Sequence, residues 1–242
     1  MDKLHLDQHI SRQYNEELEQ VRNRVFAMGE LAREQLLGSL AAVLDGDPDR
    51  GRKLDAADDE LDDLERAIDD ECQRILARRQ PAAVDLRLMI SILKTITDLE
   101  RMGDEAQKMA RMAIRRAEEG TGSLPESDGL RALGAHVGRM VDDMLTALAA
   151  LDAQKAFAVC REDAEIDAEY KALVKASLPS LAADPANALD LVWAARALER
   201  IGDHACNICE YLIYLLGGED VRHAPLDEVA EAARKAKERH ED

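Results

Sequence analysis

Aromatic residues are scarce in this chain, at 3% of its 242 residues. Folds rich in β-structure normally use more aromatic and β-branched side chains, whereas the abundant Leu, Ala, Glu and Arg favour helix. No apolar run reaches the length of about 18 residues that marks a membrane-spanning helix. The composition therefore predicts an all-α protein without a transmembrane segment.

Positive charge is also in short supply, because 32 Lys and Arg stand against 50 Asp and Glu, for a net charge of −18. This charge repels phosphate backbones, and no basic patch with interleaved aromatics is present, so we expect no nucleic-acid binding. The first residues (MDKLHLDQHI) lack the basic start and apolar stretch of a secretory signal. We expect a cytoplasmic protein.

The chain has four cysteines, and each lies inside a helical pattern rather than in a disulfide-rich loop framework. Cys206 and Cys209 form a C-x-x-C motif. A zinc site usually requires a second such pair or a nearby pair of histidines, and the sequence offers neither. Packing of the thiols as small hydrophobes is therefore favoured over a metal or redox role.

Apolar residues recur at three- and four-residue steps and predict six long helices. Gly, Pro and Asp clusters separate them, and the stretch GTGSLPESD at 120–128 is the clearest linker. The predicted helices cover about 7–44, 48–79, 83–119, 129–151, 153–178 and 185–216. We expect a first repeat over 1–119, a second over 129–224, and a charged helical tail over 225–242 that is frayed or disordered.

The two halves contain matching residues in the same order. The segment Glu100–Ala106 (ERMGDEA) agrees with Glu199–Ala205 (ERIGDHA) at five of seven positions. Upstream, Asp58–Asp62 (DDELD) aligns with Asp163–Asp167 (DAEID), and Leu44-Asp45 aligns with Leu151-Asp152. Ordered matches indicate a duplication, so we predict two tandem, pseudo-symmetric three-helix bundles.

Each half thus carries D-x-x-x-D on its second helix and E-x-x-x-D on its third. Residues four apart differ by about 40° around a helix axis, so both carboxylates of a motif project from one face. If the second and third helices lie side by side, four carboxylates meet in each half. The predicted site residues are Asp58, Asp62, Glu100 and Asp104 in the first half and Asp163, Asp167, Glu199 and Asp203 in the second.

Ionised carboxylates at close range repel one another unless a cation lies between them. Oxygen-only ligands suit hard ions, so the candidate cofactors are Mg²⁺, Mn²⁺ or iron. Residues 55–71 add ten acids against one base, Arg66, although like charges one turn apart destabilise a helix. A metal-free, solvated acidic face remains the alternative.

Gly103 and Gly202 stand inside the helical patterns, where glycine costs about 1 kcal/mol relative to alanine. Their repeated position before Asp104 and Asp203 indicates close approach of a neighbouring helix, or of a metal cluster. Arg101 and Arg200 follow the glutamates and either orient the carboxylates or form surface ion pairs.

Catalytic motifs are absent: the chain has no G-x-S-x-G, P-loop, H-E-x-x-H or dinucleotide fingerprint. His204 in the second motif is replaced by Glu105 in the first, which excludes a shared histidine mechanism. We expect a protein that is not an enzyme. The alternatives are a metal-dependent phosphoester hydrolase and a metal-free helical scaffold that binds basic partners.

Together these motifs resemble the PhoU family of phosphate-signalling regulators. The resemblance also covers RQPAAVDLR at 79–87, Asp98-Leu99-Glu100 and GEDVRH at 218–223. It implies paired three-helix bundles with multinuclear metal clusters on the eight carboxylates. It further implies a negative regulator of phosphate uptake and of the phosphate-starvation response, an adaptor between the Pst transporter's ATPase subunit and the sensor kinase PhoR. We expect a homodimer that reaches the membrane only through these partners.

Overall fold

The computed structural model describes residues 12–122 and 124–241, and over these ranges the chain forms helices and no strands. The prediction of an all-α fold is confirmed. The helices are α1 (Arg12–Asp45), α2 (Pro48–Arg79), α3 (Ala83–Glu119), α4 (Ser127–Ala150), α5 (Ala153–Ala183), α6 (Pro185–Gly217) and α7 (Leu226–Glu241). Residues 7–11, where the first helix was predicted to begin, lie outside the described residues.

The helix ends agree with the sequence signals except around α4 and α5. Ser127 already belongs to α4, so the linker is shorter than predicted. The predicted end of the fifth helix at Leu178 is wrong, because α5 continues through Pro179 to Ala183. Proline lacks only its own N–H, and the next turns keep their bonds, as when Asp184 N–H donates to Ser180 O at 2.8 Å.

The second helix of each half begins with the same cap. Asp47 accepts hydrogen bonds from the backbone N–H groups of Asp49 and Arg50, and Asp152 accepts from those of Gln154 and Lys155. Such caps satisfy N–H groups that the first helical turn leaves without partners. The structural counterpart of Asp152 is therefore Asp47, and our alignment of Asp152 with Asp45 was wrong by two positions.

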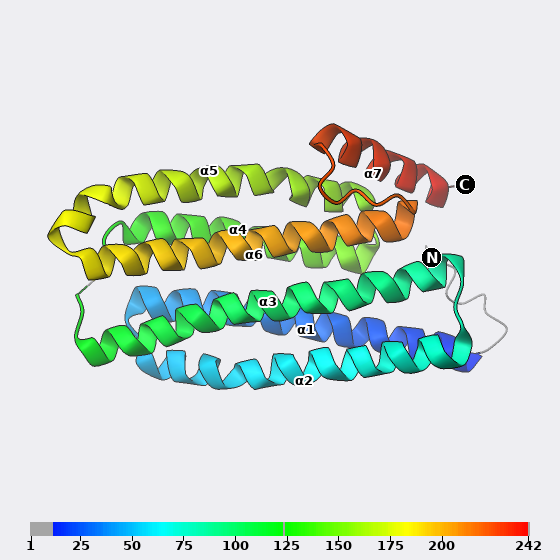
Figure 1. Cartoon of the computed structure of the whole chain (residues 1–242), viewed down its shortest axis with the longest axis horizontal. Helices are drawn as coiled ribbons and strands as arrows, with labels where there is room; N and C mark the ends of the chain where they lie inside the picture. Colours follow the sequence, from blue (N-terminus) through cyan, green and yellow to red (C-terminus); the bar gives the residue numbers. More distant parts are fainter. Residues whose placement is uncertain (1–11, 123, 242) are drawn as a thin grey trace.

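Two three-helix bundles lie side by side, α1–α3 in one and α4–α6 in the other (Figure 1). Within each bundle the second and third helices pack along each other. Between bundles, α3 packs along α6 and α1 along α4. The bundles thus share one continuous apolar core, which contains Met28, Leu99, Met140 and Ile201 with less than 1% exposure.

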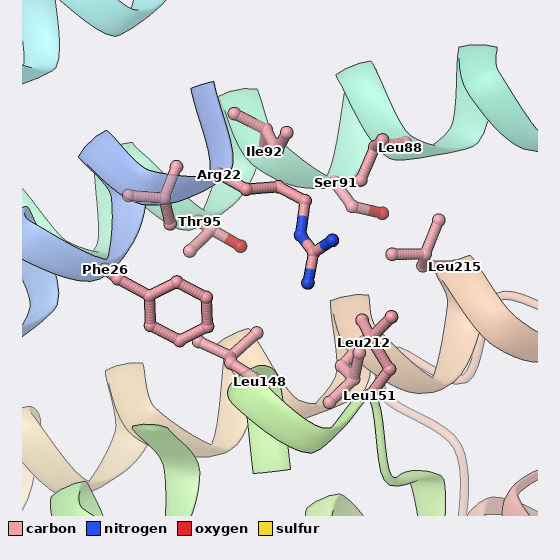
Figure 2. Close-up of a pocket in the computed structure, with 11 residues that line it drawn as sticks. Arg22, Phe26, Leu88, Ser91, Ile92, Thr95, Leu148, Leu151, Leu212 and Leu215 are labelled. Atoms are coloured by element: carbon pink, nitrogen blue, oxygen red, sulfur yellow. The ribbon is translucent and has the colours of Figure 1, made fainter. Parts of the chain in front are cut away.

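At one end of the interface the packing leaves a cavity of about 50 Å³ lined mainly by apolar side chains, among them Leu88 of α3, Leu148 of α4 and Leu212 of α6. Figure 2 shows the Arg22 guanidinium of α1 pointing into it, near the hydroxyls of Ser91 and Thr95.

Buried polar contacts also join the bundles, and Arg116 at the end of α3 makes the largest set. Its Nη1 donates to Asn187 Oδ1 at 2.5 Å and to Asp190 Oδ2 at 2.8 Å, both on α6. Its Nη2 donates to Gly122 O in the linker at 2.5 Å. Arg116, Asn187 and Asp190 are all buried. This cluster fixes the linker and the start of α6 against the first bundle.

The charged segment after Pro225 is helical as predicted, but the expectation of a frayed tail is wrong. Helix α7 packs on α5 and α6 at the end of the second bundle (Figure 1). Its small apolar residues Val229, Ala232, Ala233 and Ala236 are buried, and Arg239 donates to Gly217 O. Four small apolar side chains among many charged ones make the apolar stripe of this helix hard to recognise in the sequence. They nevertheless allow α7 to pack closely on α5 and α6.

Candidate metal centres

The four predicted carboxylates of the first half lie along the packed pair α2 and α3. Asp58 is buried at 9% exposure, and Asp62, Glu100 and Asp104 are half-buried. Within the described chain, none of the four forms an ion pair or a hydrogen bond. Compensation of these carboxylates is therefore limited to the longer-range charges of Arg111, near Asp58, and Arg101, near Glu100.

Gly103 allows this close approach, as the sequence indicated. A Cβ atom at Gly103 would lie 2.3 Å from Leu61 Cδ2 and 3.4 Å from Asp58 Oδ1. Leu61 stands between the two aspartates of the first motif on α2, so the missing side chain brings that motif against α3. The neighbouring helix therefore accounts for the glycine.

The second half repeats the arrangement with looser packing. Ile166 of α5 occupies the place of Leu61 and lies over Gly202, where a Cβ would meet its Cγ2 at 3.4 Å. This is ordinary van der Waals contact. The pseudo-symmetry therefore includes these two glycines, since each lies under the corresponding apolar residue of the second helix of its bundle. The contact is tight at Gly103 and ordinary at Gly202.

Burial and mutual repulsion disfavour ionisation of the first cluster. The pKa of Asp58 rises to about 6 through burial and then through the charges of Asp62 and Asp104. The pKa of Glu100 rises to about 7 through burial and then through Asp104, Glu65 and Asp62. These couplings connect carboxylates of α2 and α3, so the two motifs form one electrostatic unit.

The second cluster shows the same pattern, with local cations added. Burial, followed by Asp203 and Asp167, raises the pKa of Asp163. Burial also raises the pKa of Glu199, followed by the charge of Asp203, and Arg196 partly offsets the effect. Arg196 donates to Glu199 Oε1, and Lys171 pairs with Asp167. Two of the four carboxylates thus form ion pairs, and the charges of Arg196 and Arg200 partly offset the raised pKa of Asp203.

Both clusters have the donor chemistry for a hard cation. Glu199 Oε2 is buried and has no hydrogen-bond partner, which is costly for a carboxylate oxygen. Asp58 also has no hydrogen-bond partner, but its oxygens keep some contact with solvent. In residues 12–122 and 124–241, however, no three Asp, Glu, His or Cys side chains converge closely enough to form a ready-made metal site. The eight ligands therefore stay a prediction.

Neighbouring residues singled out from the sequence have structural roles. Arg200 pairs with Glu105 of α3, its Nε lying 3.0 Å from Glu105 Oε1, so it connects the bundles. His204 Nδ1 lies 2.7 Å from Asp98 Oδ1, again between α6 and α3. The roles of Arg116, Asn187 and Asp190 were not predicted, because a single arginine among several basic residues gives no sequence signal.

The four cysteines are free thiols, with Cys209 buried and Cys206 half-buried. Burial raises the pKa of Cys209 well above its usual value. Cys160 Sγ–H donates to Cys206 O at 3.7 Å. A protonated, packed thiol is a small hydrophobe, which agrees with the core-packing interpretation.

The geometry defines a class of protein, a duplicated helical bundle with one acidic face per repeat. The PhoU domain model matches residues 25–113 and 130–212, one match per bundle. The chain is 45% identical to the PhoU homologue of Pseudomonas aeruginosa over 234 residues, 96% of each chain. It is 39% identical to the PhoU protein of Escherichia coli K12 over 232 residues, 95% of each chain.

Solved structures of PhoU proteins have the same fold as this chain. The crystal structure of PhoU from Pseudomonas aeruginosa superposes with a TM-score of 0.81, covering 85% of this chain and 100% of that one. The regulatory protein PhoU from Streptococcus pneumoniae, 31% identical, gives 0.78, covering 85% of this chain and 97% of that one. This chain belongs to the PhoU family. None of the described helices combines the length and apolar character needed to cross a membrane.

Proposed function

We propose that this protein is the accessory regulator of a phosphate-specific transport system and represses phosphate uptake when phosphate is plentiful. The observation that supports the proposal most strongly is similarity along the whole chain. The Pseudomonas aeruginosa and Escherichia coli relatives are named phosphate-specific transport system accessory proteins, and each aligns over at least 95% of both chains. In this proposal, the protein described here acts in the cytoplasm, between the Pst ATPase subunit and the sensor kinase PhoR.

Gene deletion tests this role. In phosphate-rich medium the deletion strain should express phosphate-starvation genes and accumulate phosphate, and a plasmid copy of the wild-type gene should restore repression. Unchanged expression in the deletion strain would refute the regulatory role.

We also propose that both acidic faces bind Mg²⁺, Mn²⁺ or iron. The eight carboxylates would hold the ions, and the bound ions would relieve the mutual repulsion of the carboxylates in each half. The buried, unpartnered Glu199 Oε2 and the buried Asp58 support this proposal.

Elemental analysis after purification without chelators tests the metal sites. The variant Glu100→Ala, Asp104→Ala, Glu199→Ala, Asp203→Ala should lose bound metal and keep its helical circular dichroism. Metal retained by this variant would reject the ligand assignment. Wild-type protein that binds no metal at physiological concentrations would favour the metal-free scaffold.

A catalytic role is not part of the proposal. The large cavity between α3 and α6 is lined by none of the eight carboxylates, so this cavity does not place a substrate beside the proposed metal. Metal-loaded protein should be inert toward phosphate monoesters and diesters. Turnover that is lost in the quadruple alanine variant would overturn this expectation.

A further inference from the structure

A groove with a volume of about 1140 Å³ runs between α3 and α6, with Tyr170 of α5 at its edge. We refer to it as the α3–α6 groove. Trp193, the only tryptophan of the chain, lines it with 69% of its surface exposed. Leu189, one turn earlier on α6, is 48% exposed. The largest apolar side chain of the protein therefore faces solvent in a concave site.

The floor of the groove is apolar. Met109 and Met112 of α3 and Ala197 of α6 line it, and all three are buried. Exposed tryptophan beside flexible methionines is typical of surfaces that bind other proteins, since tryptophan is enriched among residues that dominate binding energy. A helix about 10 Å wide and about three turns long would fill a comparable volume.

Cations outnumber acids among the residues that line the groove. Four cations line it, Lys108, Arg111, Arg115 and Arg196, against the two acids Glu105 and Asp190. Each cation already forms an ion pair, with Glu105, Asp55, Asp190 and Glu199 respectively. Lys108 and Arg111 keep 60% and 61% of their side-chain surface exposed. Ion pairs of such exposed cations are weak, so Lys108 and Arg111 can exchange their present partners for the carboxylates of an acidic ligand, which the rest of a chain with a net charge of −18 would repel.

We propose that the α3–α6 groove is the docking site for an acidic amphipathic helix of a partner protein. The apolar face of that helix packs on Trp193 and Leu189, and its acidic residues lie against Lys108 and Arg111. This inference rests on the proposed function, because it places the contact with the transport or signalling system on one surface of the chain.

A second copy of this chain fits the groove less well. The strongly acidic helix α2 supplies charge but no anchor, because the large apolar side chains found exposed in the described residues lie on other helices. Two copies, each with a net charge of −18, also repel each other at low salt.

Peptide binding tests the groove directly. The probe is a fluorescein-labelled helix of about 16 residues, long enough to form a helix, with leucine on one face and glutamate on the other. A matched probe has lysine in place of glutamate. The full chain should bind the acidic probe by fluorescence anisotropy at least tenfold more tightly than the lysine probe, and added salt should weaken binding.

Two variants and two matched controls assign the binding to the groove. Trp193→Ala should weaken acidic-probe binding about tenfold or more, and Lys108→Glu should weaken it and strengthen binding of the lysine probe. Leu226→Ala and Lys235→Glu remove an exposed leucine and reverse an exposed lysine on α7, and should change neither affinity. Lys108→Glu keeps the test valid if Trp193→Ala misfolds.

Equal affinity for the two probes, or equal effects of groove and α7 variants, would overturn the proposal. Light scattering gives a further test. A wild-type dimer that becomes a monomer in Trp193→Ala would also overturn the proposal, because a second copy of the chain would then occupy the groove. Pull-down with the purified transporter ATPase and sensor kinase separates the two hypotheses. If wild type and Lys108→Glu capture the ATPase or the kinase equally well, the docking site in the groove is refuted and the proposed function stands. If wild type captures neither protein, the proposed function is refuted.

Discussion

Metal-free protein should lose stability as the pH rises from 5 to 8, and Glu100 should account for a measurable part of that loss. The pKa of its carboxyl rises from 4.5 to about 7 in the folded protein. Below the lower value both the folded and unfolded chains bind the proton. Between the two values only the folded chain retains it, so rising pH favours the unfolded state. The loss is complete above about pH 7.

The size of this effect follows from the shift. A displacement of about 2.5 pKa units corresponds to about 3.4 kcal/mol for a fully shielded group. Glu100 is only half-buried, so solvent screening reduces this to about 1–2 kcal/mol. Asp58, whose pKa rises from 3.8 to about 6, acts in the same direction.

Urea unfolding of chelator-treated protein at pH 5 and pH 8 measures the effect, with circular dichroism as the readout. The variant Glu100→Gln should flatten the pH dependence by about 1–2 kcal/mol. The control is Glu118→Gln, at an exposed position on the same helix, which should leave the pH dependence of the unfolding free energy unchanged. If Glu100→Gln shows the wild-type slope, burial and repulsion at this site do not have the energetic role inferred here.

Three further outcomes are expected. Arg116→Ala should cost about 3–5 kcal/mol in unfolding free energy, because it leaves buried acceptors without their donor, and Arg116→Lys should not restore the loss; a cost below 1 kcal/mol would contradict the buried cluster. Gly103→Ala should destabilise by about 1–2 kcal/mol through overpacking, whereas Gly202→Ala should be neutral or stabilising by up to about 1 kcal/mol; equal effects by urea unfolding would contradict the difference in packing. Mg²⁺ should change the fluorescence emission of Trp193, because ligation of Glu199 releases Arg196 one turn away, and emission that stays constant at saturating Mg²⁺ would count against this coupling.

The sequence predicted the helices and the repeat because both depend on local patterns. Pro48 at the start of α2 and the glycine after α6 are capping signals that need no tertiary information. The proximity of the two motifs in each half followed from helix periodicity and the assumption that the second and third helices are neighbours. That assumption is met in both bundles.

Interactions between distant residues were not predictable in the same way. Arg116 and Asp190 are 74 positions apart, and the neighbouring Arg115 has the same residue type. Only the packing of α3 along α6 makes one arginine buried and the other half-exposed. Trp193 continues the apolar pattern of α6, and its exposure follows from the groove between α3 and α6 that it lines.

The two acidic faces differ in a way that bears on metal affinity. In the second half, Glu199 and Asp167 already pair with Arg196 and Lys171, so a metal ion must displace protein cations before it can use all four ligands. In the first half, none of the described carboxylates Asp58, Asp62, Glu100 and Asp104 forms an ion pair, and Arg111 and Arg101 only partly offset the raised pKa values of Asp58 and Glu100. The same hard ion therefore gains more from the first site, provided that the α2 and α3 carboxylates can turn toward one point. Because no ion pair has to be broken at the first site, the first repeat should bind metal more tightly than the second.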